Sequence, residues 1–324
     1  MHPTLHAKTH LNYPMSPDIG IPGYRSGVAD APGRAWYADA AVPLSPRTLL
    51  NYRHAFHAGN FADLVKHAVL LRLLAELTRP GPPLTVIDTH AGRGLYDLAG
   101  PEARKSGEAA AGILQLMQAK DAPAEFASLI RTVAALNGGG EVRRYPGSPW
   151  LIAESLRPAD RYLACELQPE EHEGLRVVLR GRQNVRTLCT DGYAAAVAEC
   201  PRAGRVLVLI DPPFEQPDDY VRIVETLAAL RRRNRTAQAL VWLPIKDLET
   251  FDAFLRDLED GVDAPMVAAE TRIRPLTDPM TMNGCALVLV GGPDLDAPLA
   301  AICGWVAQAL GAGGGARVYA LSPQ

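Results

Sequence analysis

The stretch GRVLVLIDPPF, residues 204–214, decides the fold class of this chain. Its run of branched apolar residues has the length and composition of a strand that is buried on both faces. Asp211 and two prolines then end the strand abruptly. Similar apolar runs end in an acid at Asp88, Glu166 and Asp191. Because segments of helical periodicity separate these runs, the pattern predicts an α/β fold with a doubly wound, mostly parallel sheet. Ligands of such a sheet lie beyond the carboxyl ends of its strands.

Composition narrows the class of protein. The 324 residues are 48% hydrophobic and 21% charged, which is typical of a globular chain. The formal net charge of −3 excludes a broadly basic surface, so any contact with nucleic acid is expected to be local. The cysteines show no paired spacing, and no apolar run is long enough for a membrane span or a signal peptide. These features predict a cytoplasmic protein without membrane contact.

Periodicity and breaker residues place the other elements along the chain. Strands are expected at 84–90, 161–167, 185–192, 204–213, 238–245, 266–274 and 285–292. Helices are expected within 61–81 and at 106–119, 122–136, 149–156, 169–181, 218–231, 249–259 and 295–310. Ser148 is expected to cap the helix that follows it, with Pro149 in the first turn.

The chain divides into two parts at about residue 48. Residues 1–48 are rich in proline, glycine, alanine and serine, and are predicted to form a disordered extension ahead of one folded domain, 49–324. A start codon assigned too far upstream is the alternative explanation. Within the domain, the long interval between Asp88 and Glu166 predicts an inserted segment at about 100–144. Its role is either substrate recognition or merely covering the surface.

The acids at the strand ends suit a nucleotide-like ligand. Asp88 opens the loop DTHAGRG, in which two glycines let the backbone approach a ligand, although a tight turn explains them equally well. Glu166 occupies the place where doubly wound nucleotide-binding folds hold the ribose hydroxyls. Asp191, followed by Gly192, could accept a hydrogen bond from the exocyclic amine of an adenine ring.

The residues DPPF suit the methylation of an exocyclic amine on a nucleobase. The lone pair of such an amine is delocalised into the ring, so the nitrogen is a poor nucleophile. Two acceptors aimed at its N–H bonds, the Asp211 carboxylate and the Pro212 carbonyl, would favour a more nucleophilic nitrogen. The prolines stiffen the turn, and Phe214 offers a face on which a flipped base can stack. An ordinary proline turn is the alternative.

The segment NYRHAFHAGNFADLVKH, residues 51–67, carries basic and aromatic side chains ahead of the first strand. A zinc site built on His54 and His57 was considered, but no cysteine or carboxylate set completes it, so no metal is predicted. Tyr52, His54 and Lys66 are better interpreted as a cationic, aromatic lip over a cofactor and a substrate phosphate.

Several motifs in this order resemble one known family. They are YRHAFHAGNFADLVKH, DTHAGRGLY, YPGSP, CELQP, the TDG at 190–192 and IDPPF. The chain is similar over residues 50–322 to the RlmJ family, which methylates the N6 amine of an adenine in 23S ribosomal RNA. The resemblance implies a Rossmann-like class I methyltransferase that uses S-adenosyl-L-methionine and carries a small helical insertion. It also implies naked or pre-ribosomal 23S rRNA as the partner, without an obligate protein partner.

The resemblance also implies roles for single residues. The cofactor would contact His67, His90, Ser148, Glu166, Asp191 and Gly192, with Asp88 at the same strand edge. Asp211 would be the catalytic acceptor and touch the cofactor as well, assisted by Pro212 and Phe214. Tyr52 and His54 would line the active site, and Lys66 would lie near the substrate. The chain departs from the family in carrying Phe rather than the commoner Tyr at 214, and in its long N-terminal extension.

The sequence therefore favours a 23S rRNA adenine-N6 methyltransferase. Two alternatives remain at this level. DPPF alone does not distinguish RNA from DNA, so a DNA adenine-N6 methyltransferase is one alternative. A non-catalytic nucleic-acid-binding or DNA-utilisation protein is the other.

Overall fold

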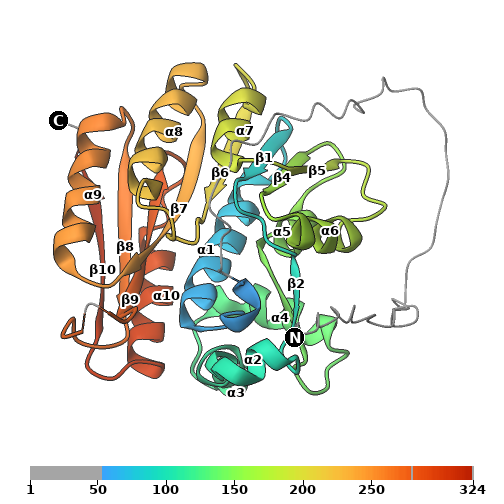
Figure 1. Cartoon of the computed structure of the whole chain (residues 1–324), viewed down its shortest axis with the longest axis vertical. Helices are drawn as coiled ribbons and strands as arrows, with labels where there is room; N and C mark the ends of the chain where they lie inside the picture. Colours follow the sequence, from blue (N-terminus) through green and yellow to red (C-terminus); the bar gives the residue numbers. More distant parts are fainter. Residues whose placement is uncertain (1–52, 279, 323–324) are drawn as a thin grey trace, which may run out of the picture. The chain divides into compact units, whose positions relative to one another are not determined.

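The computed structural model describes residues 53–278 and 280–322. The predicted extension 1–48 and Tyr52 lie outside the described residues. The described chain contains a sheet in the order β10-β8-β9-β7-β6-β1-β4-β5 (Figure 1). Its strands are β1 Leu84–Asp88, β4 Arg161–Glu166, β5 Val185–Cys189, β6 Arg205–Ile210, β7 Gln238–Ile245, β8 Met266–Arg272, β9 Gly284–Val290 and β10 Gly315–Leu321.

The centre of this sheet is parallel. β1 pairs with β4 and with β6, β4 pairs with β5, and β6 pairs with β7, all in parallel. β9 is antiparallel to both β7 and β8, and β10 is antiparallel to β8. The predicted doubly wound, mostly parallel sheet is confirmed, and its reversed strands lie towards one edge.

Helices cover both faces of the sheet, which explains why its central strands read as continuous apolar runs. Along β6, Leu207 and Leu209 belong to one core cluster, whereas Val206, Val208 and Ile210 belong to another. The first cluster includes residues of α1 Phe61–Leu77, α4 Ala127–Leu136, α5 Ser148–Ser155, α6 Pro169–Val178 and α10 Asp296–Ala309. The second includes residues of α7 Gly192–Glu199, α8 Asp219–Arg233 and α9 Leu248–Gly261.

The segment between β1 and α5 forms its own small unit of structure. Two short strands, β2 Leu95–Asp97 and β3 Arg144–Pro146, form an antiparallel pair, and a group of short helices lies between them in the chain. These helices are α2 Pro101–Ser106, η2 Glu108–Ala111, α3 Ile113–Gln118 and η3 Ala124–Phe126, followed by α4. The predicted single helix at 106–119 is wrong, because Gly107 adopts a φ of 69° and Gly112 separates η2 from α3.

Two further expectations differ from the structure. Ser148 is the first residue of α5, and Gly147 occupies the N-cap position, so the predicted Ser148 cap is wrong. The Ser148 hydroxyl donates instead to Asp88, 3.0 Å away, on a strand that local sequence reasoning could not connect to it. The last strand, β10, was not expected from the sequence. Of the residues that the structure describes, none belongs to a helix long and apolar enough to cross a membrane.

Candidate functional site

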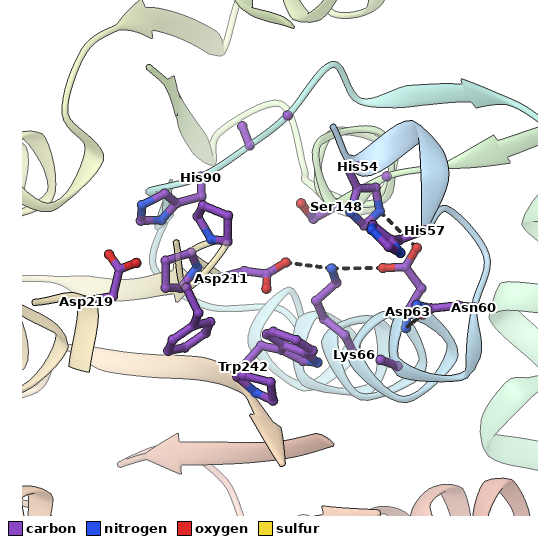
Figure 2. Close-up of a pocket in the computed structure, with 18 of the residues that line it drawn as sticks. His54, His57, Asn60, Asp63, Lys66, His90, Ser148, Asp211, Asp219 and Trp242 are labelled. Carbon is purple, nitrogen blue, oxygen red and sulfur yellow. Dashed lines mark hydrogen bonds and ion pairs between the residues drawn. The ribbon is translucent and has the colours of Figure 1, made fainter. Parts of the chain in front are cut away.

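A cavity of about 540 Å³ lies at the carboxyl ends of β1, β4 and β6. Figure 2 shows its side chains, which come from the segment before β1 as well as from the strand ends. Predicted site residues that line it are His54, Lys66, His67, His90, Ser148, Glu166, Asp211, Pro212 and Phe214. Asp88, Asp191 and Gly192 are not among the residues that line it. The parallel sheet thus brings most of the predicted residues together.

Register places the loops after β1 and β6 beside each other. Asp88 is the register partner of Leu209, and the Thr89 backbone N–H donates to the Leu209 carbonyl over 3.0 Å. The Thr89 hydroxyl also donates to Leu209 O, so its single proton is used. The 2.7 Å contact between Thr89 Oγ1 and His90 Nδ1 therefore requires Nδ1 to be the donor. This bond fixes the tautomer and the ring position of His90 at the cavity wall.

A chain of buried ionic contacts runs from α1 to Asp211 (Figure 2). Lys66 Nζ lies 2.6 Å from Asp211 Oδ2 and 2.9 Å from Asp63 Oδ1. His54 Nε2 lies 3.0 Å from Asp63 Oδ2. Burial alone would raise the pKa of Asp63, but His54 and Lys66 lower it well below its usual value. Burial opposes the charge of Lys66 too, yet the two carboxylates raise its pKa. Asp63 and Lys66 are therefore both charged.

His67 is a buried, neutral histidine at the back of the cavity. Burial lowers its pKa to about 3, an effect that the neighbouring Asp63 only partly opposes. Its Nδ1 lies 2.8 Å from the Tyr145 hydroxyl. Among the described residues, His67 Nε2 has no hydrogen-bond partner although it is buried. A polar ligand in the cavity would supply the missing partner.

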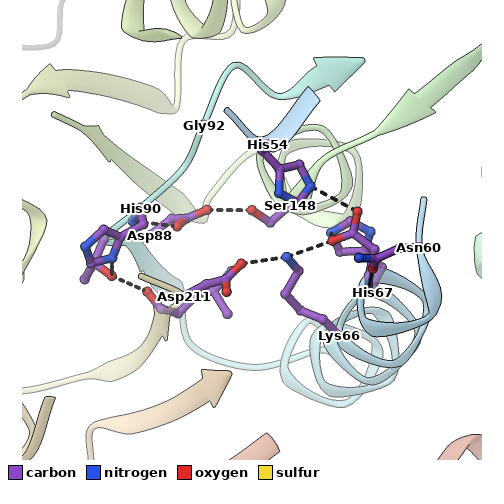
Figure 3. Close-up of polar contacts among 12 residues, drawn as sticks. His54, Asn60, Lys66, His67, Asp88, His90, Gly92, Ser148 and Asp211 are labelled. Carbon is purple, nitrogen blue, oxygen red and sulfur yellow. Dashed lines mark hydrogen bonds and ion pairs between the residues drawn. The ribbon is translucent and has the colours of Figure 1, made fainter. Parts of the chain in front are cut away.

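Asp88 is fully buried and is held by neutral donors (Figure 3). The hydroxyls of Ser148 and Tyr162 donate to its Oδ2 over 3.0 and 3.2 Å, and the His90 N–H donates to its Oδ1 over 3.3 Å. Burial raises the pKa of Asp88 to about 7, with a further contribution from Asp211. Asp88 thus acts on the cavity through the two lining residues that it holds, Ser148 and His90.

Glu166 presents a partly used carboxylate at the end of β4. Its Oε2 accepts from the Gly92 N–H over 2.9 Å, and its Oε1 accepts from the Gln168 N–H over 2.7 Å. Burial raises its pKa, which these two bonds partly counter. A carboxylate has about four acceptor positions, so acceptor capacity remains for hydroxyl groups of a ligand. Gly92, with a φ of 64°, gives the loop the left-handed turn that this contact needs.

Asp191 caps α7 and binds an arginine. Its side chain accepts from the N–H groups of Tyr193 and Ala194, and Arg222 lies 2.7 Å from its Oδ2. Arg222 itself lines the cavity and stacks over the Tyr193 ring at 4.2 Å. At Gly192, a Cβ atom would come within 1.8 Å of the Thr89 carbonyl oxygen. The close approach of α7 to the loop after β1 therefore requires glycine at this position.

Asp211 differs from the other acids at the strand ends in its local hydrogen bonds. Each of the others accepts from the backbone N–H two residues later: Asp88 from His90, Glu166 from Gln168 and Asp191 from Tyr193. The residue two positions after Asp211 is Pro213, which has no N–H. The carboxylate therefore faces Lys66 and the cavity instead of its own backbone.

Phe214 lies beside other aromatic rings at the cavity wall. It adopts a φ of 53°, a left-handed conformation that is uncommon for a bulky residue. Its ring centroid lies 4.9 Å from that of Tyr220 and 5.9 Å from that of Trp242. Such strain often marks a functional site. Here it brings the ring to the cavity directly after the two prolines.

The histidines that suggested zinc are used differently. His57 Nδ1 lies 2.9 Å from Glu108 Oε1, and this hydrogen bond raises the pKa of His57 despite the opposing effect of burial. His54 instead contacts Asp63. Within 53–278 and 280–322, no three or more histidine, cysteine or acidic side chains are grouped so that they could hold a metal ion.

Comparison with known families identifies the family of this chain. A model of the family described as "Ribosomal RNA large subunit methyltransferase D, RlmJ" matches residues 81–321. The chain belongs to the RlmJ family. This membership confirms the predicted family, its class I methyltransferase fold, the enzyme class and the methyl donor S-adenosylmethionine.

Individual RlmJ relatives agree with the family match. The chain is 35% identical over 247 residues to "Ribosomal RNA large subunit methyltransferase J" of Haemophilus influenzae, and 33% identical over 246 residues to the protein of the same name from Escherichia coli. Each alignment covers 76% of this chain and 88% of the relative. A crystal structure of a Legionella pneumophila protein aligns with a TM-score of 0.74 at 29% identity, covering 83% of this chain and 99% of that one.

Asp63, Arg222 and Trp242 are among the cavity-lining residues that were not predicted from the sequence. Asp63 is the buried partner of Lys66, Arg222 is the partner of Asp191, and Trp242 lines the cavity beside Phe214. Asp63 had a signal, since an acid three residues before a lysine inside an apolar helix must be paired when both are buried. Arg222 and Trp242 had none, because α8 and β7 meet the other site residues only in the folded sheet.

Proposed function

We propose that this chain transfers a methyl group from S-adenosylmethionine to the N6 amine of an adenine in 23S ribosomal RNA. The observation that carries the proposal is Asp211, an acid at a strand end that is kept off its own backbone and directed into a cavity, next to Phe214. The names of the relatives supply the polymer, since both are called large-subunit ribosomal RNA methyltransferases.

The Asp211 side acts on the amine. Lys66 occupies Asp211 Oδ2, and the carboxylate retains acceptor capacity for an N–H of the base. The Pro212 carbonyl is the second acceptor, and neither Pro212 nor Pro213 offers an N–H that would compete with the amine. The methylated nitrogen first carries a positive charge and readily loses its proton to a nearby acceptor or solvent, so Asp211 needs to orient the nitrogen rather than to act as a strong base. Phe214 provides the stacking face for a base removed from its helix.

The side formed by β1 and β4 suits the cofactor. S-adenosylmethionine, when bound, supplies a methyl group on a positively charged sulfur. The structure fits such a ligand because Glu166 has spare acceptor capacity for ribose hydroxyls and His67 Nε2 is a buried polar atom without a partner. His90 and Ser148 line the same wall, held by Thr89 and Asp88. We further propose contacts from Gly192 and Asp191, and place His54 and Lys66 on the substrate side.

A labelled-methyl assay tests the proposal. Purified protein is mixed with S-adenosylmethionine and either in vitro transcribed 23S rRNA, assembled large subunits or double-stranded DNA. We expect label in the free rRNA, less in assembled subunits and none in DNA, with N6-methyladenosine as the labelled nucleoside after digestion. Label in DNA would instead support a DNA methyltransferase.

Calorimetry with S-adenosylmethionine alone separates the remaining alternative. A non-catalytic nucleic-acid-binding protein would show no cofactor binding and no methyl transfer to any polymer.

We also propose that the protein acts in the cytoplasm, because naked or pre-ribosomal RNA, its proposed substrate, is found there before the subunits are complete.

A further inference from the structure

Asp63 is a buried acid that has no role in the methyl transfer proposed above. Its side chain is only 3% exposed and lies in the first turn of α1, between the apolar residues Ala62 and Leu64. Figure 2 shows the Asp63 carboxylate between Lys66 of α1 and His54 of the segment before it. Its Oδ2 accepts from His54 Nε2 over 3.0 Å and from the Gly59 N–H over 2.9 Å, and its Oδ1 lies 2.9 Å from Lys66 Nζ.

These contacts divide into two groups. The bonds from His54 and Gly59 hold the Asp63 carboxylate in place. The contact with Lys66 then transmits this position to a flexible side chain that reaches Asp211. A lysine ammonium sits on four rotatable carbons and takes its position from its partners. With Asp211 as its only partner, Lys66 could move with ligand binding.

Burial makes a purely structural explanation insufficient. A buried carboxylate is costly unless it is paired, and an apolar residue at the same place is often as stable or more stable. Accepting the Gly59 N–H is a local task at the start of a helix, and a neutral amide oxygen could perform it equally well. The contact with Lys66 is what requires a negative charge.

We propose that Asp63 is a positioning residue, which holds the Lys66 ammonium between two carboxylates so that Asp211 keeps a fixed orientation at the cavity wall. The inference rests on the proposed methyl transfer. The Lys66 ammonium pairs with two carboxylates, those of Asp63 and Asp211. Its single positive charge therefore does not fully neutralise Asp211. Two N–H groups of the Lys66 ammonium face Asp63 and Asp211, and these two contacts fix the direction of the third N–H.

Asp63→Asn tests the proposal because it retains an oxygen for the Gly59 N–H and removes the charge that binds Lys66. The matched control is Glu76→Gln, which removes another acid of α1, one that pairs with Arg72 and Arg79. For both variants, kcat for methyl transfer to transcribed 23S rRNA is expressed per cofactor-binding site counted by calorimetry, so unfolded protein does not contribute. We expect kcat of Asp63→Asn to fall about 100-fold, as is typical when a reacting group is misplaced. Its affinity for S-adenosylmethionine should stay within about threefold of the wild type, and Glu76→Gln should match the wild type.

A double-mutant cycle with Lys66→Met shows whether Asp63 acts through Lys66. In the Lys66→Met background, we expect Asp63→Asn to lower kcat by no more than about threefold further. A full additional loss would overturn the inference, as would unchanged kcat in Asp63→Asn or loss of all cofactor binding in that variant. Partial recovery of kcat in Asp63→Glu, which restores the charge, would support it. An inactive wild-type protein in the same assay would contradict the proposed function itself, independently of Asp63.

Discussion

The loops that follow β1 and β6 start side by side and offer opposite hydrogen-bonding groups. After β1, the chain presents backbone N–H groups, of which those of His90 and Gly92 donate to carboxylates. After β6, Pro212 and Pro213 have no N–H, so the backbone of these two residues presents only carbonyl acceptors. Asp88 at the first loop is fully buried, whereas the side chain of Asp211 at the second is 17% exposed and faces the cavity.

This difference explains how two acids at neighbouring strand ends acquire different tasks. Asp88 is consumed by the protein's own donors and supports the residues around it. Asp211 is protected from its own backbone by Pro213 and is left to a cation and a ligand. The N–H groups of residues 89–92 donate to the protein's own acceptors, whereas the acceptors at Asp211 and Pro212 suit an amine.

Asp211→Asn should produce the largest effect. The amide keeps the size of the side chain, but it offers an N–H towards the amine. It also lacks the negative charge that forms the ion pair with Lys66. We expect kcat for methyl transfer to fall about 1,000-fold, within the range seen for removal of a group that acts directly on the reacting atom. Calorimetry with S-adenosylmethionine and thermal unfolding check that the variant is folded and binds the cofactor.

Asp88→Asn is the matching change in the other loop. We expect it to lower kcat less than about tenfold, because Asp88 reaches the cavity only through Ser148 and His90. Equal losses of kcat in the two variants would contradict the division of tasks between the two acids.

Pro213→Ala should have an intermediate effect. It restores an N–H two residues after Asp211, at the position from which the other three strand-end acids accept a bond. We expect the Asp211 carboxylate to turn partly towards this N–H, so that kcat falls about tenfold, equivalent to about 1.4 kcal/mol. Kinetic assays on transcribed 23S rRNA measure this loss.

Pro212→Ala is the control for loss of a rigid ring in the same turn. It adds an N–H only one residue after Asp211, and we expect a smaller loss of kcat than for Pro213→Ala. If the two alanine variants behave alike, the effect of the prolines is stiffness rather than the missing donor.

The pH dependence of stability tests the burial of Asp88 independently of catalysis. The pKa of Asp88 is raised from 3.8 to about 7 in the folded protein, so between these values the folded state holds a proton that the unfolded state releases. The stabilisation from this group is full below pH 3.8 and is lost as the pH rises to about 7. We expect the free energy of unfolding of the wild type, relative to Asp88→Asn, to decrease by at most about 1.4 kcal/mol per pH unit in this range. Urea denaturation at several pH values measures this difference, and parallel pH profiles of the two proteins would contradict it.

The predictable part of the molecule is its local pattern. Strand β6 and the acid after it follow from an apolar run and a proline stop, and the common edge follows from the parallel arrangement. Glu166 was expected at the same sheet edge as Asp211 from the strand pattern, whereas the roles of His90 and Ser148 were expected from the family resemblance.

The unpredicted part depends on contacts between distant segments. The Ser148 hydroxyl was assigned to its own helix, but Asp88, 60 residues earlier, binds it in the fold. The helix expected at 106–119 was divided at glycines whose turns are set by packing, since a Cβ on Gly112 would lie 2.1 Å from Gly59 O. β2 and β3 are three residues each and carry too little periodicity to identify.

The ion pair between Lys66 and Asp211 also has a consequence for the order of folding. It joins residues 145 positions apart, so α1 is made long before the strand that completes its polar partners. Until β6 has been synthesised and has paired with β1, Lys66 and Asp63 have only each other and the segment around them. Contacts of such long range form late, after the intervening chain has been ordered. The proposed active site is therefore assembled only after β6 has paired with β1, and a partly made chain without β6 also lacks the contact between Lys66 and Asp211.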